Sequence, residues 1–184
     1  SAPMSASVAP SPVAQTTPGE FPWRVLGLLN LFRFTVTLIL LAVLFLIRDP
    51  RIVGELKPVL AAAALIVLLT FAIGVFFLLR PRVPDVTAQA FTQFSVDLVA
   101  IVMLMHASGG VSSGFGGLLI VSIASVSLLI RLDQALLLCA FGTFALLGEQ
   151  AYSYAEGASA AADFAASGVL AAVLFVVGGV VQLL

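Results

Sequence analysis

A run of glycine and serine between residues 106 and 117 has the residue types closest to a known binding motif. It reads His-Ala-Ser-Gly-Gly-Val-Ser-Ser-Gly-Phe-Gly-Gly. Gly109 and Gly114 have the spacing of the two glycines of a P-loop, in which backbone N–H groups and a lysine hold phosphate. Phe115 and Gly116 stand where that motif has lysine and serine or threonine. The run therefore predicts no phosphate site.

The same run is typical of a turn between two helices. Gly109 suits the position just beyond a helix, where the backbone is left-handed, and Ser112 or Ser113 could N-cap the next helix. We expect 111–116 to enter the edge of a bilayer, packed against protein because bare backbone cannot face lipid. The candidate signalling positions in the run are His106, Gly109, Gly110, Ser112, Ser113, Gly114 and Gly117.

Arg33 and Asp97 are the two charges placed well inside apolar segments. A lone charge at mid-bilayer costs at least about 2.5–3.5 kcal/mol on insertion scales, so partners or water are expected. One hypothesis is a buried Arg33–Asp97 pair that fixes the packing of two helices. The alternative is that Arg33 extends to the membrane interface while Asp97 is protonated or hydrogen-bonded alone.

Metal or catalytic chemistry finds little support in the residues. His106 follows Met103 and Met105 but is the one histidine of the chain, and no carboxylate or thiol adjoins it in sequence. We expect His106 to pack at a helix end and Cys139 to act as a small buried hydrophobe. Glu149 is either exposed to water or a ligand at the rim, and exposure is favoured. No nucleophile–base pair, carboxylate dyad or nucleotide motif occurs, so the sequence predicts no catalytic site, cofactor or metal.

The segments that carry these residues are long and apolar. Apolar residues make up 61% of the 184 residues and charged ones 9%, against about 45–50% and about 25% in soluble domains. The composition predicts an all-α integral membrane protein, and without a basic block nucleic acid is excluded as a partner. A spanning helix needs about 20 apolar residues. Six helices are predicted after a disordered tail at 1–21, within one domain at 22–184: 25–47, 58–79, 88–106, 112–130, 134–152 and 161–184.

Two further features concern how the helices sit. The fourth segment is marginal in length, and basic residues weakly favour cytoplasmic N- and C-termini in a six-helix bundle. A stripe of small residues in the last helix, which includes Gly168, allows close backbone approach. An internal contact within the bundle is the favoured role of this stripe, and a dimer face is the alternative.

Several motifs resemble the membrane domain of PilS-type sensor histidine kinases. The most specific is Ala107-Ser-Gly-Gly-Val-Ser-Ser-Gly114 followed by Gly117-Leu-Leu-Ile-Val. Weaker matches, which extend the resemblance over about residues 24–184, are Arg24 with Leu29-Asn-Leu-Phe-Arg33, Phe91-Thr-Gln-Phe-Ser-Val-Asp97, Leu128-Leu-Ile-Arg131, Glu149-Gln-Ala-Tyr152 and Gln182. Residues 1–23 show no resemblance.

The resemblance implies a six-helix sensory domain in the bacterial inner membrane. It implies a kinase whose cytoplasmic parts form a homodimer and phosphorylate a PilR-type response regulator, and a membrane domain that senses the pilin helix. This segment carries no phospho-accepting histidine motif and is expected not to be an enzyme by itself. A small solute-binding subunit of a transporter is the alternative function, and a passive anchor is a third.

Overall fold

The computed structural model describes residues 20–47, 53–79 and 85–183, and these residues form helices joined by short connectors. The long helices are α1 (Phe21–Leu46), α2 (Pro58–Leu79), α3 (Val86–Ala107), α5 (Leu132–Ala155) and α6 (Asp163–Val181). Between α3 and α5 lie a 3₁₀ turn, η1 (Gly110–Ser113), and the shorter α4 (Gly116–Ser127). The all-α fold class expected from composition is confirmed in the described residues. The predicted tail lies outside them, apart from Glu20 and Phe21, and Phe21 already belongs to α1.

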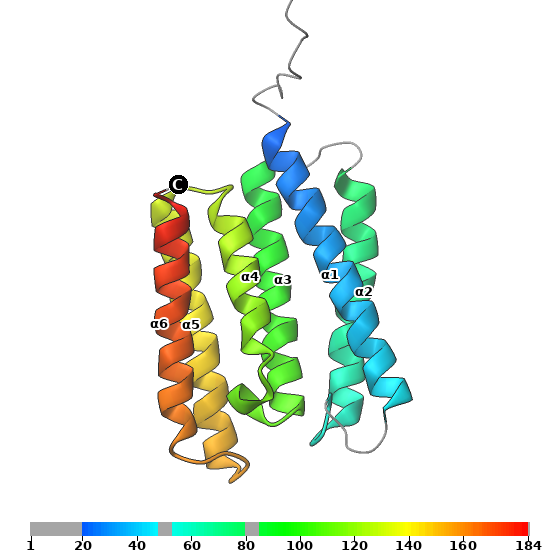
Figure 1. The fold of residues 1–184 in the computed structure, drawn as a ribbon, viewed down its shortest axis with the longest axis vertical. Helices are drawn as coiled ribbons and strands as arrows, with labels where there is room; N and C mark the ends of the chain where they lie inside the picture. The colour runs from blue at the N-terminus through cyan, green and yellow to red at the C-terminus, as the bar shows by residue number, and fades with distance from the viewer. Residues whose placement is uncertain (1–19, 48–52, 80–84, 184) are drawn as a thin grey trace, which may run out of the picture.

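The helices form a bundle in which neighbours along the chain are antiparallel (Figure 1). The α1–α2 hairpin lies on one side, α3 and α4 are central, and the α5–α6 hairpin lies on the other side. Successive helices run in opposite directions, so α1 begins and α6 ends at the same end of the bundle. Five of the helices are long and apolar enough to cross a membrane. The membrane orientation of that shared end stays a prediction.

The core lies where α3, α4, α5 and α6 meet. Phe94, Ile123 and Leu146 are among the buried side chains that pack there. Outward-facing positions are as apolar as inward ones, as in Phe144, which is 76% exposed. A helix that is apolar all round is what a lipid-facing surface requires, because lipid and core are equally apolar.

The fourth helix is shorter than predicted. We expected a helix over 112–130, but α4 is 12 residues long and the residues before it form η1. Gly109 and Gly114 flank η1 with φ of 100° and 79°, a left-handed backbone that only glycine adopts readily. Gly109 therefore ends α3 as expected. The N-cap prediction for the serines is wrong, because Phe115 holds that position and the Ser112 and Ser113 hydroxyls donate to the Gly109 and Gly110 carbonyls.

The small-residue stripe of the last helix does not make the internal contact that we favoured. Gly168 is exposed, and a methyl group added there would meet nothing within 4 Å. The buried face of α6 is instead Ser167, Ala171, Leu174 and Gly178. Among the glycines of α6, Gly178 makes the closest approach to a neighbouring helix, since a Cβ at this position would lie 2.6 Å from the Cys139 sulfur.

Candidate functional site

Two polar clusters lie within the bundle, one half-way along the helices and one at the end opposite the termini. The mid-bundle cluster consists of Asn30, Arg33, Gln93, Asp97 and Ser122, which come from α1, α3 and α4. The loop-end network consists of Lys57, His106, Glu149, Tyr152, Ser153 and Glu156, which come from the α1–α2 connector, α3, α5 and the residue after α5.

Arg33 and Asp97 form a two-point ion pair at the centre of the mid-bundle cluster. Arg33 Nε lies 2.5 Å from Asp97 Oδ1, and Nη2 lies 2.8 Å from Oδ2. Both side chains are 4% exposed. Each residue stands near the middle of its helix, so the two charges lie at similar depth and can make contact. The structure thus brings the two charges together, as the pair hypothesis requires.

The other members of the mid-bundle cluster satisfy the remaining polar atoms of the pair. Arg33 Nη1 donates to Gln93 Oε1 at 3.2 Å and to Asn30 Oδ1 at 3.3 Å. The Ser122 hydroxyl donates to Asp97 Oδ2 at 2.5 Å, which adds α4 to the cluster. The Arg33 guanidinium also lies over the Phe71 ring, 5.4 Å from its centroid. Buried charges are tolerated when paired and hydrogen-bonded in this way.

The cavity beside this cluster is small. Its volume is about 30 Å³, and Arg33, Asp97 and Ser122 contribute to a lining that is otherwise mostly apolar. A cavity needs a volume of roughly 10–15 Å³ to hold one water molecule. The space therefore holds one or two waters and no organic solute.

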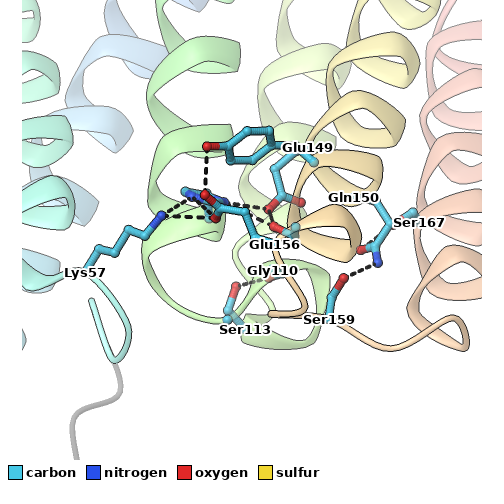
Figure 2. A network of polar contacts seen from close by, with 12 residues as sticks. Lys57, Gly110, Ser113, Glu149, Gln150, Glu156, Ser159 and Ser167 are labelled. Atoms are coloured by element: carbon cyan, nitrogen blue, oxygen red, sulfur yellow. Dashed lines mark hydrogen bonds and ion pairs between the residues drawn. The ribbon is translucent and has the colours of Figure 1, made fainter.

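The loop-end network is centred on His106, the last-turn histidine of α3. Figure 2 shows the network from close by, with Lys57, Glu149 and Glu156 labelled. Its Nδ1 lies 3.2 Å from Glu149 Oε1 and 3.1 Å from Ser153 Oγ. Its Nε2 lies 2.8 Å from Lys57 Nζ and 3.9 Å from Glu156 Oε2. Lys57 Nζ also donates to Glu156 Oε2 at 3.4 Å. Side chains separated by up to 99 positions in sequence thus meet at one end of the bundle.

Glu149 lies differently from our expectation. We favoured exposure to water, but the residue is only 7% exposed. Its Oε1 accepts the Ser153 hydroxyl at 2.6 Å, while Oε2 is buried without a hydrogen-bond partner. The rotation of α5 could not be predicted, since polar residues occur on both its buried and its exposed faces. Glu149 therefore provides His106 with a carboxylate partner, although the two residues are 43 positions apart in the sequence.

Glu156 is held as an anion at the edge of the network. The Tyr152 hydroxyl donates to Glu156 Oε1 at 2.8 Å, and this bond is the main cause of a Glu156 pKa below its ordinary value. Partial desolvation opposes the lowering, and Lys57 adds to it. The glutamate is therefore ionised at neutral pH.

Backbone contacts dock the α1–α2 connector onto the end of α3. The Leu56 and Lys57 N–H groups donate to the Ala107 carbonyl, each at 3.0 Å, and Gly54 N–H donates to the Ser108 hydroxyl at 2.9 Å. Gly54 has a φ of 68°, and a Cβ there would lie 2.8 Å from the Ala61 methyl group, so the turn needs glycine. Lys57 is thereby fixed next to His106.

Two glutamines that sequence analysis did not assign to a site tie the helices together. Gln150, fully buried in α5, donates to Ser159 Oγ at 2.9 Å and accepts from Ser167 Oγ at 3.4 Å. Gln182, at the end of α6, donates to the Ser127 and Ile130 carbonyls in the turn between α4 and α5, at 2.5 and 2.9 Å. Polar residues within or beside long apolar runs were the sequence signal for both.

No group of three or more His, Cys, Asp or Glu residues that could hold a metal ion occurs in the part of the chain that the structure describes. Both clusters are instead built from internal ion pairs and hydrogen bonds. Their arrangement is suited to fixing helices against one another and to changing those contacts when a charge changes.

Comparison with known proteins identifies the family. Residues 16–184 match the family described as PilS-like transmembrane domain, so the match begins ahead of residue 24, where the resemblance of the motifs begins, and includes 16–23. The chain is 30% identical over 127 residues to the sensor protein kinase PilS of Pseudomonas aeruginosa. The aligned region covers 67% of this chain and 23% of that protein. No solved structure matches. With its membrane-length helices the chain is a multi-pass protein of the bacterial inner membrane, and it belongs to the family of PilS-like transmembrane domains.

Proposed function

We propose that this chain is the sensory membrane domain of a two-component histidine kinase. The chain spans 23% of the length of the sensor kinase that it resembles, so kinase activity would reside in other parts of the protein. The domain itself would receive a signal in the membrane and pass it on through α6. In the full protein we expect a homodimer and a PilR-type response regulator as the phosphorylation partner.

The proposed topology has both termini in the cytoplasm. The same-end location of the start of α1 and the end of α6 fits this arrangement, and so does the weak bias of basic residues in the sequence. The loop-end network would then face the periplasmic side. A signal that arrives there, or from within the bilayer, would have to reach the cytoplasmic end of α6.

The observation that carries the proposal is that the polar side chains inside the bundle bind one another and join different helices. Arg33, Asp97 and Ser122 bind one another across three helices, and Gln182 fastens the end of α6 to the α4–α5 turn. A shift among α1, α3 and α4 would therefore displace the exit of α6. This connectivity is what a signal-transmitting bundle requires.

The transporter alternative requires a solute cavity at mid-depth. The cavity beside Arg33 and Asp97 holds about 30 Å³, too little for an organic solute. The polar atoms of the cluster are also occupied by one another. Both observations favour sensing over solute transport.

A membrane-embedded partner such as the pilin helix is the proposed signal. Recognition between helices in lipid relies on close packing at small residues and on a few polar contacts. A lipid-facing groove beside the third, fourth and sixth helices would favour such sensing. The structure has a groove of about 700 Å³ between α1 and α2, lined in part by Trp23, Gly27 and Phe76, and one of about 360 Å³ between α2 and α3.

Leucine at Gly110 or Gly114 is expected to lock or abolish signalling while membrane insertion is retained. Both glycines have a left-handed backbone, with φ of 76° and 79°, which costs other residues about 1–2 kcal/mol. The strained turn would shift η1 relative to α3, α5 and α6, which it contacts. The measurement is response-regulator phosphorylation by the full-length kinase at low and high pilin levels.

Gly117→Leu is the matched control for these substitutions. Gly117 lies in the same run and, as at Gly110 and Gly114, a Cβ added there would meet nothing within 4 Å, but its φ is not positive. We expect this variant to signal normally. A normal pilin response in Gly110→Leu and Gly114→Leu would contradict a role of the turn, and an equal loss in Gly117→Leu would show a general packing defect.

A further inference from the structure

The loop-end network contains the only histidine and the only lysine of the chain, in direct contact. We propose that protonation of His106 exchanges the partner of its Nε2, releasing Lys57 and binding Glu156, while Nδ1–H keeps its contact with Glu149. The network would then act as a proton-operated latch between the α1–α2 connector and the end of α5. That the latch responds to periplasmic pH rests on the proposed topology, whereas the exchange itself does not.

The hydrogen bonds assign the proton on the neutral ring. The Ser153 hydroxyl donates its proton to Glu149 Oε1 at 2.6 Å, so both groups near His106 Nδ1 are acceptors. Nδ1 must therefore carry a hydrogen. A lysine ammonium is a donor with no acceptor site, so Nε2, 2.8 Å from Lys57 Nζ, must be unprotonated. The contact with Lys57 is available only to the neutral Nδ1–H tautomer.

A proton on Nε2 abolishes this arrangement. The nitrogen becomes a donor facing another donor, and the ring becomes a cation next to an ammonium group. Glu156 Oε2 is already 3.9 Å from Nε2 and is the acceptor that can replace Lys57. Lys57 also contacts this oxygen, at 3.4 Å, and would lose that contact when Nε2–H takes it; the lysine is 45% exposed and can turn into water. The step takes one proton from water and exchanges one hydrogen bond of Nε2 for another.

Three charged groups lie next to the ring. Glu149 and Glu156 are the carboxylates that face it, from α5 and its C-cap, and Lys57 is the cation, from the connector before α2. Tyr152 packs its ring 5.5 Å from the imidazole, and η1 carries no charged residue. Glu149 Oε2 is buried without a hydrogen-bond partner, so this carboxyl group keeps an acceptor oxygen that the neutral ring does not use. Histidine is the side chain that changes charge between pH 5 and 8, and His106 is 14% exposed, within reach of water.

The lone imidazole allows a direct test by nitrogen NMR on the purified chain with labelled histidine. We expect unprotonated Nε2 and protonated Nδ1 at pH 8, and protons on both nitrogens at pH 5. An Nε2–H tautomer at pH 8, or a ring that stays neutral at pH 5, would overturn the proposal. Lys57→Met should weaken the tautomer preference, since it removes the donor to Nε2.

Acylation of the lone lysine tests the release of Lys57. Its rate is measured by mass spectrometry in the wild-type chain and in His106→Gln, which keeps a polar acceptor that does not titrate. The ratio of the two rates removes the intrinsic pH dependence of the amine. We expect this ratio to rise by up to about tenfold between pH 8 and 5, the effect of losing one hydrogen bond to a charged group. A ratio that stays constant would show a fixed structural contact and contradict the latch.

Discussion

Asp97→Ala is expected to destabilise the bundle by about 3–5 kcal/mol, the usual cost of removing one partner from a buried ion pair. The substitution leaves the Arg33 guanidinium, which is 4% exposed, with only the Gln93 and Asn30 carbonyl oxygens as acceptors. Arg33→Ala should cost a similar amount, because Asp97 would keep only the Ser122 hydroxyl. The measurement is the free energy of unfolding in detergent micelles.

A double-mutant cycle measures the interaction energy between Arg33 and Asp97 apart from the contacts that each makes with other residues. The double variant of Arg33→Ala and Asp97→Ala should lose clearly less than the sum of the single losses, because neither charge is left unpaired. Ser122→Ala is the control, since it removes a partner of Asp97 while the ion pair remains, and it should cost about 1 kcal/mol. Strictly additive losses would contradict an energetic role of the pair.

The second large effect is expected at Gly178, the glycine of α6 that lies closest to α5. Gly178→Ala should destabilise the chain by about 1–3 kcal/mol, the cost of adding a methyl group to a packed interior. The new Cβ would lie 2.6 Å from the Cys139 sulfur, 3.7 Å from Ser127 Oγ and 3.9 Å from Ile123 Cγ1. Cys139 has little freedom to withdraw, because it is fully buried and its thiol donates to the Leu174 carbonyl at 3.3 Å.

Two further variants make this prediction specific. Gly179→Ala, at the next position, meets nothing within 4 Å and should be neutral or stabilising by up to about 1 kcal/mol, as expected for glycine to alanine in a helix. Cys139→Ala in the Gly178→Ala background removes the clashing sulfur and should restore most of the lost stability. Equal effects of the substitutions at 178 and 179 would show that the contact does not limit packing. The measurement is the free energy of unfolding in micelles, for the wild type, the two single variants and the double variant.

If α6 transmits the signal, the same substitution should also change kinase output. Gly178 lies one turn before Gln182, whose side chain binds the α4–α5 turn. A displaced α6 would break these hydrogen bonds at the point where the chain leaves the bundle. We expect the pilin response of the full-length kinase to change in Gly178→Ala and to remain in Gly179→Ala.

Much of the fold could be predicted from composition and segment length. Apolar runs of membrane length gave an all-helical membrane protein, and α2 has the predicted bounds because Pro58 starts it. The depth of Arg33 and Asp97 in their segments was enough to propose their contact. These inferences succeed because the bilayer demands helices of a set length and does not tolerate lone charges.

The rotation of each helix was decided only by the tertiary structure. In a soluble protein the polar face of a helix identifies its outside, but here lipid-facing and buried positions are equally apolar. Sequence patterns therefore placed Gly168 inside and Glu149 outside, and the structure reverses both. The His106–Lys57 contact likewise joins residues 49 positions apart, from segments that no local pattern relates.

The Gly/Ser run between residues 106 and 117 shows the same division. Its sequence predicted a turn in which Gly109 is left-handed, because backbone conformation is a local property of the glycine itself. Only the tertiary structure decided that Ser112 and Ser113 bind their own turn, and that His106, at the start of the run, meets Glu149. Such contacts depend on helix packing, which in this chain is directed by a few polar residues brought together across long stretches of sequence.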